Sequence, residues 1–322
     1  MRIEMSTPPL SGPASMPVAT GAGATPGQPA AATPAAAGFP LAGSVGVVVP
    51  NYNYARYLPG RLSSIMAQGG MVGRLAFLDD ASTDDSLAVA EPLLARFACP
   101  VTVLRNAVNS GSVFRQWARG LESAETPFLW IAEADDGAEP GMLEALAQRL
   151  VEDESAVFAF SDSVGVGSDD AVVAESTKAH ASALGDHVLD RDATLAGPDF
   201  LRRCLCPRNL VVSASAVLWR TQALRAALES LGDGIDRWRV AGDWRIYAEA
   251  ASSGGPVHYD ARPFNRHRRH AASVTGALPR PRHFAEVVAM HATLRRLLGR
   301  DTMNDERMRR HLVDLRRSWE LA

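Results

Sequence analysis

The sequence predicts an α/β fold in which a mostly parallel, open sheet is flanked by helices. Two observations predict it. Short, strongly apolar runs alternate four times with segments of helical periodicity, and clusters of polar residues follow the ends of these runs. The alternation is typical of parallel sheets, because neighbouring parallel strands need a crossover connection. In such sheets ligands bind beyond the carboxyl ends of the strands, so the polar clusters mark the expected site.

Each of the first three strands is followed by apolar residues at helical spacing. Pro50 should end the first strand, and Pro92 should kink the second helix or split it in two. From their apolar character, we expect the first four strands at residues 45–49, 75–78, 101–104 and 128–132.

The pattern changes after a helix that begins near Pro140. A strand at residues 157–160 leads into a hairpin-like stretch, and residues 197–260 should hold two helices and a strand at residues 210–212. From His283 the chain is helical, with arginines opposite an apolar stripe made of Val287, Met290, Leu294 and Leu297. Such a basic amphipathic helix could lie on a membrane surface, but packing on its own domain is the preferred interpretation.

Composition divides the chain into three parts. Residues 1–43 are dominated by Ala, Pro, Gly, Ser and Thr, and such a segment cannot bury enough surface to offset its ordering entropy, so we expect a disordered tail. Residues 44–278 should form the main domain, in two parts at 44–136 and 137–278. Residues 279–322 should form a helical extension.

Overall charge excludes a broad attraction to nucleic acid. Lys and Arg total 33 against 36 Asp and Glu, a formal net charge of −3, so phosphate binding must come from local groups. Three cysteines are too few for a disulfide framework. The start lacks the pattern of a signal peptide, and no apolar stretch is long enough to span a bilayer. We therefore expect a cytoplasmic protein, with membrane association through the C-terminal helix as an option.

Polar clusters follow the first three strands. Residues 50–54 place two Asn and two Tyr there, and aromatic rings stack on bases while amides read their edges. The adjacent Asp79 and Asp80 can accept hydrogen bonds from a base or a ribose. Arg105 precedes a turn at residues 109–111, whose backbone N–H groups suit anionic or polyol ligands. Plain turns and helix caps are the simpler alternatives for these clusters.

The fourth strand ends in Glu133-Ala134-Asp135-Asp136. Three carboxylates within four residues repel one another unless a cation lies among them, and hard oxygen ligands suit Mn²⁺ or Mg²⁺. Further along, Asp243 opens a helix and is most simply an N-cap. The basic residues 266–270 could neutralise a diphosphate, or they could form an ordinary basic loop.

In this order and spacing, the segments VVVPNYNYARYL, LDDASTDDS, EADD, GDW and NRHRRHAASVT resemble the inverting glycosyltransferases of family 2. The resemblance runs from about Val45 to about Thr275 and implies the GT-A (Rossmann-like) fold. It also implies a nucleotide-binding half at residues 44–136 and an acceptor and lid half at residues 137–278. Each segment alone is only a loose match to the family, but the five segments together are specific for it.

The resemblance implies a role for each matching residue. Asp135 would contact the ribose or the metal, Asp136 would be the main metal ligand, and Asp243 would be the general base. Residues near the donor base and ribose would be Pro50, Asn51, Tyr52 and Asp79 or Asp80, with Asn53, Arg105, Asn109 and Gly111 as further donor-binding candidates from the strand-end clusters. His267, Arg268 and His270 would close over the diphosphate, and the acceptor side would include Asp162, Asn209, Ser213 and Ser215.

Three positions depart from the family pattern. Glu133 stands where an Asp is usual, and Gly242 replaces the usual Glu before the base. Ala81 replaces a frequent Gly, so we expect that turn to avoid positive φ.

The implied function is sugar transfer from a UDP- or dTDP-linked donor to a glycan or lipid-linked acceptor, in polysaccharide or glycoconjugate synthesis. One alternative is a catalytically inactive sugar- or nucleotide-binding protein of the same fold. Another is a nucleotidyltransferase, although the first strand lacks the Gly-rich phosphate loop usual for that class.

Overall fold

The computed structural model describes residues 41–182, 186–270, 273, 276, 278–299 and 301–321. Most of the predicted tail (residues 1–40) and part of the predicted lid segment beyond His270 lie outside the described residues.

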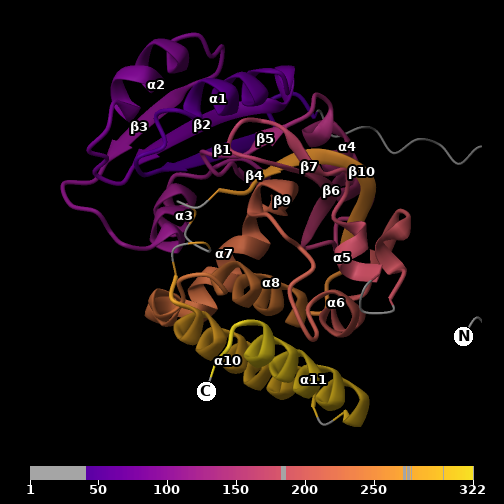
Figure 1. Cartoon of the computed structure of the whole chain (residues 1–322). Coiled ribbons are helices and arrows are strands. Elements are labelled where there is room, and N and C mark those ends of the chain that lie inside the picture. Colours follow the sequence, from indigo (N-terminus) through magenta and orange to yellow (C-terminus); the bar gives the residue numbers. More distant parts are fainter. Residues whose placement is uncertain are drawn as a thin grey trace, which may run out of the picture. The chain divides into compact units, whose positions relative to one another are not determined.

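Strands and helices alternate through the first half of the described chain (Figure 1). The strands are β1 (Val45–Asn51), β2 (Val72–Asp79), β3 (Val101–Arg105), β4 (Phe128–Ile131), β5 (Gly137–Ala138), β6 (Phe158–Val166), β7 (Val172–Ala174), β8 (Ala193–Leu195), β9 (Val217–Arg220) and β10 (Val257–Arg268). The α-helices are α1 (Leu58–Met66), α2 (Ser86–Leu94), α3 (Val113–Glu122), α4 (Met142–Glu152), α5 (Lys178–Ser182), α6 (Gly197–Cys204), α7 (Thr221–Leu231), α8 (Gly242–Ser252), α10 (Arg280–Leu298) and α11 (Thr302–Ser318). Short 3-10 turns include η3 (Ala214–Ala216) and η4 (Gly232–Arg237).

The strands form one sheet in the order β3-β2-β1-β4-β9-β6-β10-β5, with β7 beside β6 and β8 beside β10. β1 pairs in parallel with β2 and β4, and β2 pairs in parallel with β3. β6 and β10 are also parallel, whereas β9 and the short strands pair antiparallel. The predicted α/β class is confirmed, and the parallel character is confined to β1–β4 and the β6–β10 pair.

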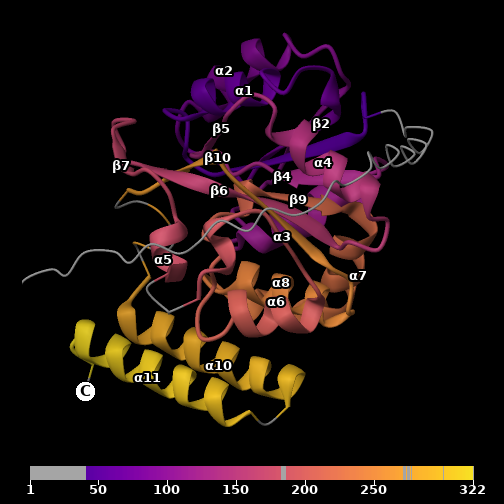
Figure 2. The same cartoon turned by 90° about the vertical axis from the view of Figure 1, so that its right-hand side faces the viewer.

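Helices cover both faces of the sheet (Figure 2). Side chains alternate along a strand, so Val47 and Val49 pack with α1, α2 and α4, while Val48 packs with α3 on the other face. The second face is also covered by α6, α7 and α8. Both faces of the central strands are therefore buried, which explains their continuous apolar runs.

Pro50 does not end β1, contrary to the prediction. The strand continues to Asn51, and Pro50 pairs with Leu78 of β2. The carbonyl of Val48 accepts a hydrogen bond from Ala132 N, which follows β4. The carbonyl of Asn51 accepts one from Asp80 N, which follows β2. The position of the missing N–H of Pro50 therefore faces β4, which has already ended at Ile131, so no ladder hydrogen bond is lost.

Other local predictions need correction. Residues 210–212 form a buried loop, and the strand of this region is β9; a short apolar run does not distinguish a strand from a buried loop. Residues 197–260 contain three α-helices, α6, α7 and α8, instead of two. Pro92 lies inside α2 and does not split it, because the helix ends only two residues later. The predicted hairpin after residue 160 is confirmed by β6 and β7.

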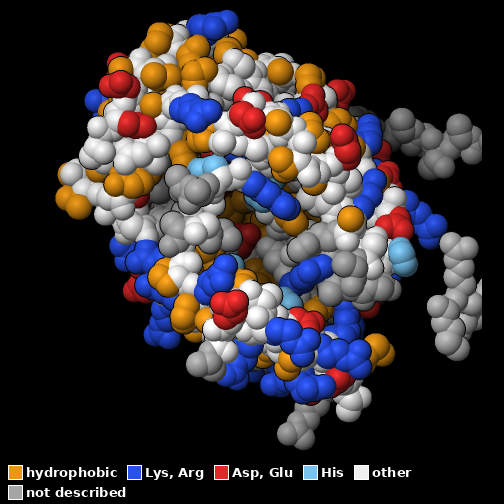
Figure 3. Space-filling view, viewed as in Figure 1, with side chains coloured by type: hydrophobic (Ala, Val, Ile, Leu, Met, Phe, Trp, Pro, Cys, Tyr) orange, Lys and Arg blue, Asp and Glu red, His pale blue; other side chains and the backbone are white. Residues whose placement is uncertain are grey.

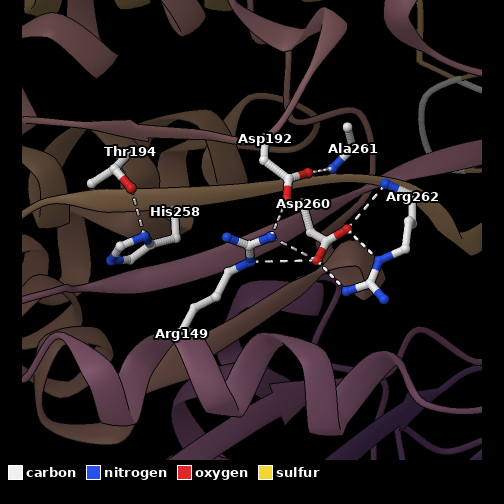
Figure 4. Close-up of polar contacts among 7 residues, drawn as sticks. All are labelled: Arg149, Asp192, Thr194, His258, Asp260, Ala261 and Arg262. Carbon is white, nitrogen blue, oxygen red and sulfur yellow. Dashed lines mark hydrogen bonds and ion pairs between the residues drawn. The ribbon is translucent and has the colours of Figure 1, made fainter. Parts of the chain in front are cut away.

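A buried ionic network fixes β10 to its neighbours (Figure 4). Asp260 is fully buried and accepts hydrogen bonds from Arg262 Nη2 at 2.6 Å and from Arg149 Nη2, on α4, at 3.1 Å. Asp192 joins the same Arg149 to the backbone N–H of Ala261. The β6–β10 register is irregular between Asp260 and Asn265, so the network fixes the strand immediately before that irregularity.

The C-terminal region forms two helices, α10 and α11, that lie side by side below α6 and α8 (Figures 1 and 2). Val287, Met290 and Leu294 are buried in the same core as α6 and α8, which confirms the preferred packing interpretation for these three residues. Leu297, the fourth residue of the predicted stripe, is 37% exposed. Within the described residues, no helix is long and apolar enough to cross a membrane.

Candidate active site

The predicted polar clusters meet at the carboxyl ends of the parallel strands. A hollow opens on this side of the molecule, between the strand-end loops and the lower helices, and an acidic side chain is visible inside it (Figure 3). The acidic run after β4 forms the centre of the cluster, and it contacts η3 and the end of β10.

Asp136 is held from two sides. Its exposed fraction is 6%, and its carboxylate accepts hydrogen bonds from Ser213 Oγ and from the backbone N–H of Arg268, each at 2.8 Å. A hydrogen bond of 2.9 Å joins Asp135 Oδ2 to His270 Nε2. The structure thus brings the predicted metal-binding residues and the predicted lid residues together.

The side chain of Glu133 contacts α3. Its carboxylate accepts a hydrogen bond from Trp117 Nε1 at 2.9 Å. Burial raises the pKa of Glu133 to about 8, and the charge of Asp135 adds to the rise. Burial and Asp136 also raise the pKa of Asp135. Ionisation of Glu133 and Asp135 is therefore unfavourable in this environment, and a bound cation would favour it.

Among the described residues, no group of three His, Cys, Asp or Glu side chains is arranged to hold a metal ion by itself. Mg²⁺ and Mn²⁺ sites that use substrate phosphates need only one or two protein carboxylates. Asp135 and Asp136 fit that smaller demand, since they are adjacent carboxylates that contact the basic end of β10.

Arg61 lies beneath the run and was missed by the sequence analysis. It is fully buried, donates from Nη2 to Ser215 Oγ at 2.8 Å, and stacks 4.7 Å from the ring centroid of Trp130. The same Ser215 Oγ accepts the backbone N–H of Glu133. Burial lowers the pKa of Arg61 to about 10, so the guanidinium remains charged at neutral pH. It is a fixed counter-charge behind the acidic run.

Asn51 and Asp79, two of the predicted donor-binding residues, lie at the ends of β1 and β2. Asn51 Nδ2 donates to Asp79 Oδ1 at 3.0 Å, and both residues are buried. Tyr52 is 44% exposed, which leaves its ring free to stack on a base. Asn53 instead supports the next loop, because its Oδ1 accepts the backbone N–H of Thr83 at 2.7 Å. Pro50 is part of the buried strand below them.

Asp80 holds the loop that follows β3. Its carboxylate accepts hydrogen bonds from the N–H and Oγ of Ser110, at 2.9 and 2.7 Å. Asn109 donates to the backbone carbonyl of Asp80 and accepts from Gly111 N, and Gly111 has a positive φ of 68°. Arg105 pairs with Glu91 of α2. Asp80 and Asn109 therefore hold this loop in place. Their predicted contacts with the donor stay predictions.

Ala81 has a φ of +60°, so the expectation that this turn avoids positive φ is wrong. Hydrogen bonds on both sides determine the turn: Ser82 N donates to Asp79 Oδ2, and Asp80 is bound to Ser110. The surrounding contacts impose the left-handed conformation despite the cost of a Cβ.

The end of β10 folds over the acidic run. Arg268 donates from Nε to the carbonyl of Asp135 at 2.7 Å and from Nη1 to the carbonyl of Gly167 at 2.6 Å. Its guanidinium also lies 4.8 Å from the ring centroid of Tyr57.

His270 lies between Tyr54 and Tyr57, at centroid distances of 5.7 and 5.4 Å. Burial and the nearby charge of Asp135 raise the pKa of Tyr54, so this tyrosine of the predicted cluster at residues 50–54 lies near the acidic run. His267 precedes the cluster on β10, opposite Gly165.

Asp243 lies in the first turn of α8, whose N-cap is Ala241. The interpretation of Asp243 as the N-cap is therefore wrong, because the N-cap lies two residues earlier. Asn209 Nδ2 donates to Asp243 Oδ2 at 3.3 Å. Burial raises the pKa of Asp243 to about 7, and the charge of Glu286 adds to the rise. Glu286, on α10, accepts the backbone N–H groups of residues 239–241 at 3.0–3.1 Å. A carboxylate that titrates near neutral pH is suited to proton transfer.

The remaining predicted acceptor-side residues lie in two places. Ser213 and Ser215 belong to the η3 turn beneath the acidic run. Asp162 is 1% exposed on β6 and accepts the N–H of Thr177 at 3.0 Å, next to α5. Asp162 therefore anchors the segment that leads into α5, and no described contact joins it to the acidic run.

The model of the family described as glycosyl transferase family 2 matches residues 46–197, which include β1, β2 and the acidic run. Residues 46–197 are thus a glycosyl transferase family 2 region. An uncharacterized glycosyltransferase of Nostoc sp. is 33% identical over 123 residues, which are 38% of this chain and 35% of that protein. Glycosyltransferase GlyG of Streptococcus pneumoniae is 28% identical over 113 residues, which are 35% of this chain and 37% of that protein. The matches thus span little more than a third of these relatives.

Solved structures of this kind of fold cover more of the chain. S. aureus TarS, in complex with UDP-GlcNAc, has a TM-score of 0.62 and 17% identity, over 86% of this chain and 73% of that one. The mannosyltransferase PcManGT of Pyrobaculum calidifontis, in complex with GDP-Man and Mn²⁺, has a TM-score of 0.57 and 16% identity, over 87% and 70%. The likeness shows the fold, which confirms the predicted GT-A arrangement.

Proposed function

We propose that this chain is an inverting glycosyltransferase that moves a sugar from a nucleoside-diphosphate donor to a hydroxyl group. One observation carries the proposal: Asp135 and Asp136 meet the basic end of β10 at the strand ends. The carboxylates that can share a cation therefore lie next to the basic side chains that can bind a diphosphate.

The donor would lie along the ends of β1 and β2, with Tyr52 against the base and Asp79 near the ribose. Solved structures of similar fold contain UDP-GlcNAc, UDP and GDP-Man, which supports a nucleotide-sugar donor. A UDP- or dTDP-linked sugar is our preferred donor, and a glycan or lipid-linked molecule our preferred acceptor, in polysaccharide or glycoconjugate synthesis at the cytoplasmic side.

Asp135 and Asp136 would hold Mn²⁺ or Mg²⁺, which when bound neutralises charge on the diphosphate. Arg268 and His270 would close over the same diphosphate. Asp243 would accept the proton of the attacking hydroxyl as the general base, because its pKa of about 7 leaves it partly ionised at neutral pH.

Thermal unfolding with a panel of nucleoside diphosphates, each with and without Mn²⁺, tests donor binding. We expect one base to raise the melting temperature, and only with the metal present. Asp136→Ala should abolish this rise, whereas Asp199→Asn, an exposed carboxylate on α6, should keep it. An Asp136→Ala protein with an unchanged response would contradict the metal role.

Transfer is tested separately with Asp243→Asn. We expect this variant to keep the nucleotide response and to lose transfer by about 10²–10⁴-fold, the usual contribution of general base catalysis. If the parent protein binds nucleotide and metal but neither hydrolyses nor transfers any donor, the inactive binding protein is the better description.

A further inference from the structure

A groove of about 640 Å³ lies outside the candidate active site, between η4, the start of α8 and the exposed face of α10. Its wall is largely apolar, with contributions from Leu231, Trp238, Ala285, Ala289 and Ala292. The three alanines are exposed and lie on one face of α10. The groove therefore offers apolar contact area that nothing in the described chain covers.

The rim of this groove is basic. Arg237, Arg245, Arg282 and Arg296 all line it. Arg245 pairs with Glu249 at 2.6 Å, but among the described residues Arg237, Arg282 and Arg296 form no ion pair. Glu286, the acidic lining residue, is already bound to the backbone N–H groups of residues 239–241. Three guanidinium groups are thus available for an anion.

The exposed face of α10 has the composition of a helix that lies at a membrane surface. Val288 is 41% exposed and extends the apolar centre formed by the alanines. Arginines stand at both ends of the helix, at 280 and 282 and again at 295 and 296, and its one acidic residue is Glu286. An apolar centre between basic ends matches the headgroup layer, where arginines contact phosphates and apolar side chains reach the acyl boundary.

Charge is also distributed unevenly along the chain. Residues 279–322 contain ten arginines and six acidic residues, a formal +4, so the other residues together carry −7. In the space-filling view, Lys and Arg side chains gather over the lower helices (Figure 3). An anionic surface would attract this end of the chain and repel the rest, which favours one orientation.

We propose that the groove and the exposed face of α10 bind the phosphate headgroup of anionic phospholipids at a membrane surface. Arg245 and Asp243 are two positions apart on α8 and point to nearly opposite sides of that helix. Lipid bound in the groove therefore leaves the candidate active site open. The proposal does not depend on glycosyl transfer.

Co-sedimentation with vesicles tests the proposal. The full chain should bind vesicles of phosphatidylcholine that contain phosphatidylglycerol, bind pure phosphatidylcholine weakly, and dissociate at high salt. The variant Arg237→Ala/Arg282→Ala/Arg296→Ala should partition on the order of a hundredfold less, because each arginine near the surface contributes about fivefold. The control Arg74→Ala/Arg96→Ala/Arg191→Ala removes the same charge elsewhere, from exposed Arg96 and Arg191 and from partly exposed Arg74, which pairs with Glu125, and should bind like the parent.

A second variant separates lipid insertion from charge alone. Val288→Asp keeps every arginine and should still weaken vesicle binding. Circular dichroism and nucleotide-dependent melting should be unchanged in all variants, which shows that they are folded. Binding of the groove variant equal to that of the parent, equal binding to pure phosphatidylcholine, or a response to inorganic phosphate without vesicle binding would each overturn the proposal.

Discussion

Ala81 holds a left-handed backbone conformation in a turn that two buried aspartates fix from either side. Glycine adopts this conformation without the steric cost of a Cβ. We therefore expect Ala81→Gly to raise the free energy of unfolding by about 0.5–1 kcal/mol, after the greater entropy of glycine in the unfolded chain is subtracted. Urea denaturation at neutral pH measures this change.

Ala88 provides a matched control. It is exposed on α2, in ordinary helical conformation. Ala88→Gly should lower the free energy of unfolding by about 0.5–1 kcal/mol. If both substitutions destabilise the chain equally, the turn at Ala81 carries no relievable strain.

Asp243 makes stability depend on pH. Its pKa in the folded chain is about 7, above the ordinary value of 3.8, so the folded state holds the proton more tightly than the unfolded state. Stability should fall as pH rises from about 4 to about 7. Because Asp243 is half-buried, we expect Asp243→Asn to gain about 1–2 kcal/mol at pH 8 and nothing at pH 4. Denaturation of both proteins at the two pH values measures the difference, and an equal gain at both would exclude this carboxylate as its source.

At the residue scale, sequence patterns predicted the carboxylates better than their partners. The acidic run and Asp79 follow apolar strands, which marks them from sequence. Arg61 lies on the buried face of α1 with Leu58, Leu62 and Ile65, and a charged residue on an apolar stripe is the signal that could have identified it. Glu286 gave no such signal, because its partners are backbone groups more than forty residues away.

Among the elements, β10 connects the buried Asp260 network to the end of the strand that covers the acidic run. Burial alone would raise the pKa of Asp260, but hydrogen bonds from Arg262 and Arg149 outweigh it and lower the pKa to about 2. Asp260→Asn removes the charge and leaves Arg149 poorly compensated. We expect it to cost about 2–3 kcal/mol at pH 7.

Acid titration and a control variant check this assignment. The contribution of Asp260 is present above pH 3.8 and is lost as pH falls through about 2, so parent and Asp260→Asn should converge near pH 2. Arg262 is 61% exposed, and Arg262→Ala should cost under about 1 kcal/mol at pH 7. A gap between parent and Asp260→Asn that persists at pH 2 would point to packing instead of charge.

The elements themselves were mostly predictable up to β4, where strands and helices follow one another and bury both faces. Prediction failed where strands come from distant segments. β9 inserts between β4 and β6, and its short apolar run resembles the buried loop at residues 210–212. Only the tertiary pairing distinguishes the two, and periodicity contains no information about it.

On the scale of the whole molecule, α10 is part of the main fold and not a removable extension. Its apolar face joins the core of α6 and α8, and Glu286 fixes the backbone before Asp243. Deletion of residues 279–322 should therefore give a chain without a cooperative thermal transition and with exposed apolar surface, measured by calorimetry and dye binding. Deletion of residues 1–40 should leave the melting temperature unchanged, as their composition predicts. A shortened chain, 1–278, that melts like the parent would contradict the role of α10.

The family match ends at residue 197, whereas Asp243, Arg268 and Glu286 come later in the chain. The acidic run thus lies in the matched stretch, whereas Ser213 and Arg268, which donate hydrogen bonds to Asp136, come from the later one. A homologue that shares only the earlier stretch therefore shares the acidic run, but the match says nothing about the residues that hold this run in place. Those residues have to be compared separately, around η3, α8 and the end of β10.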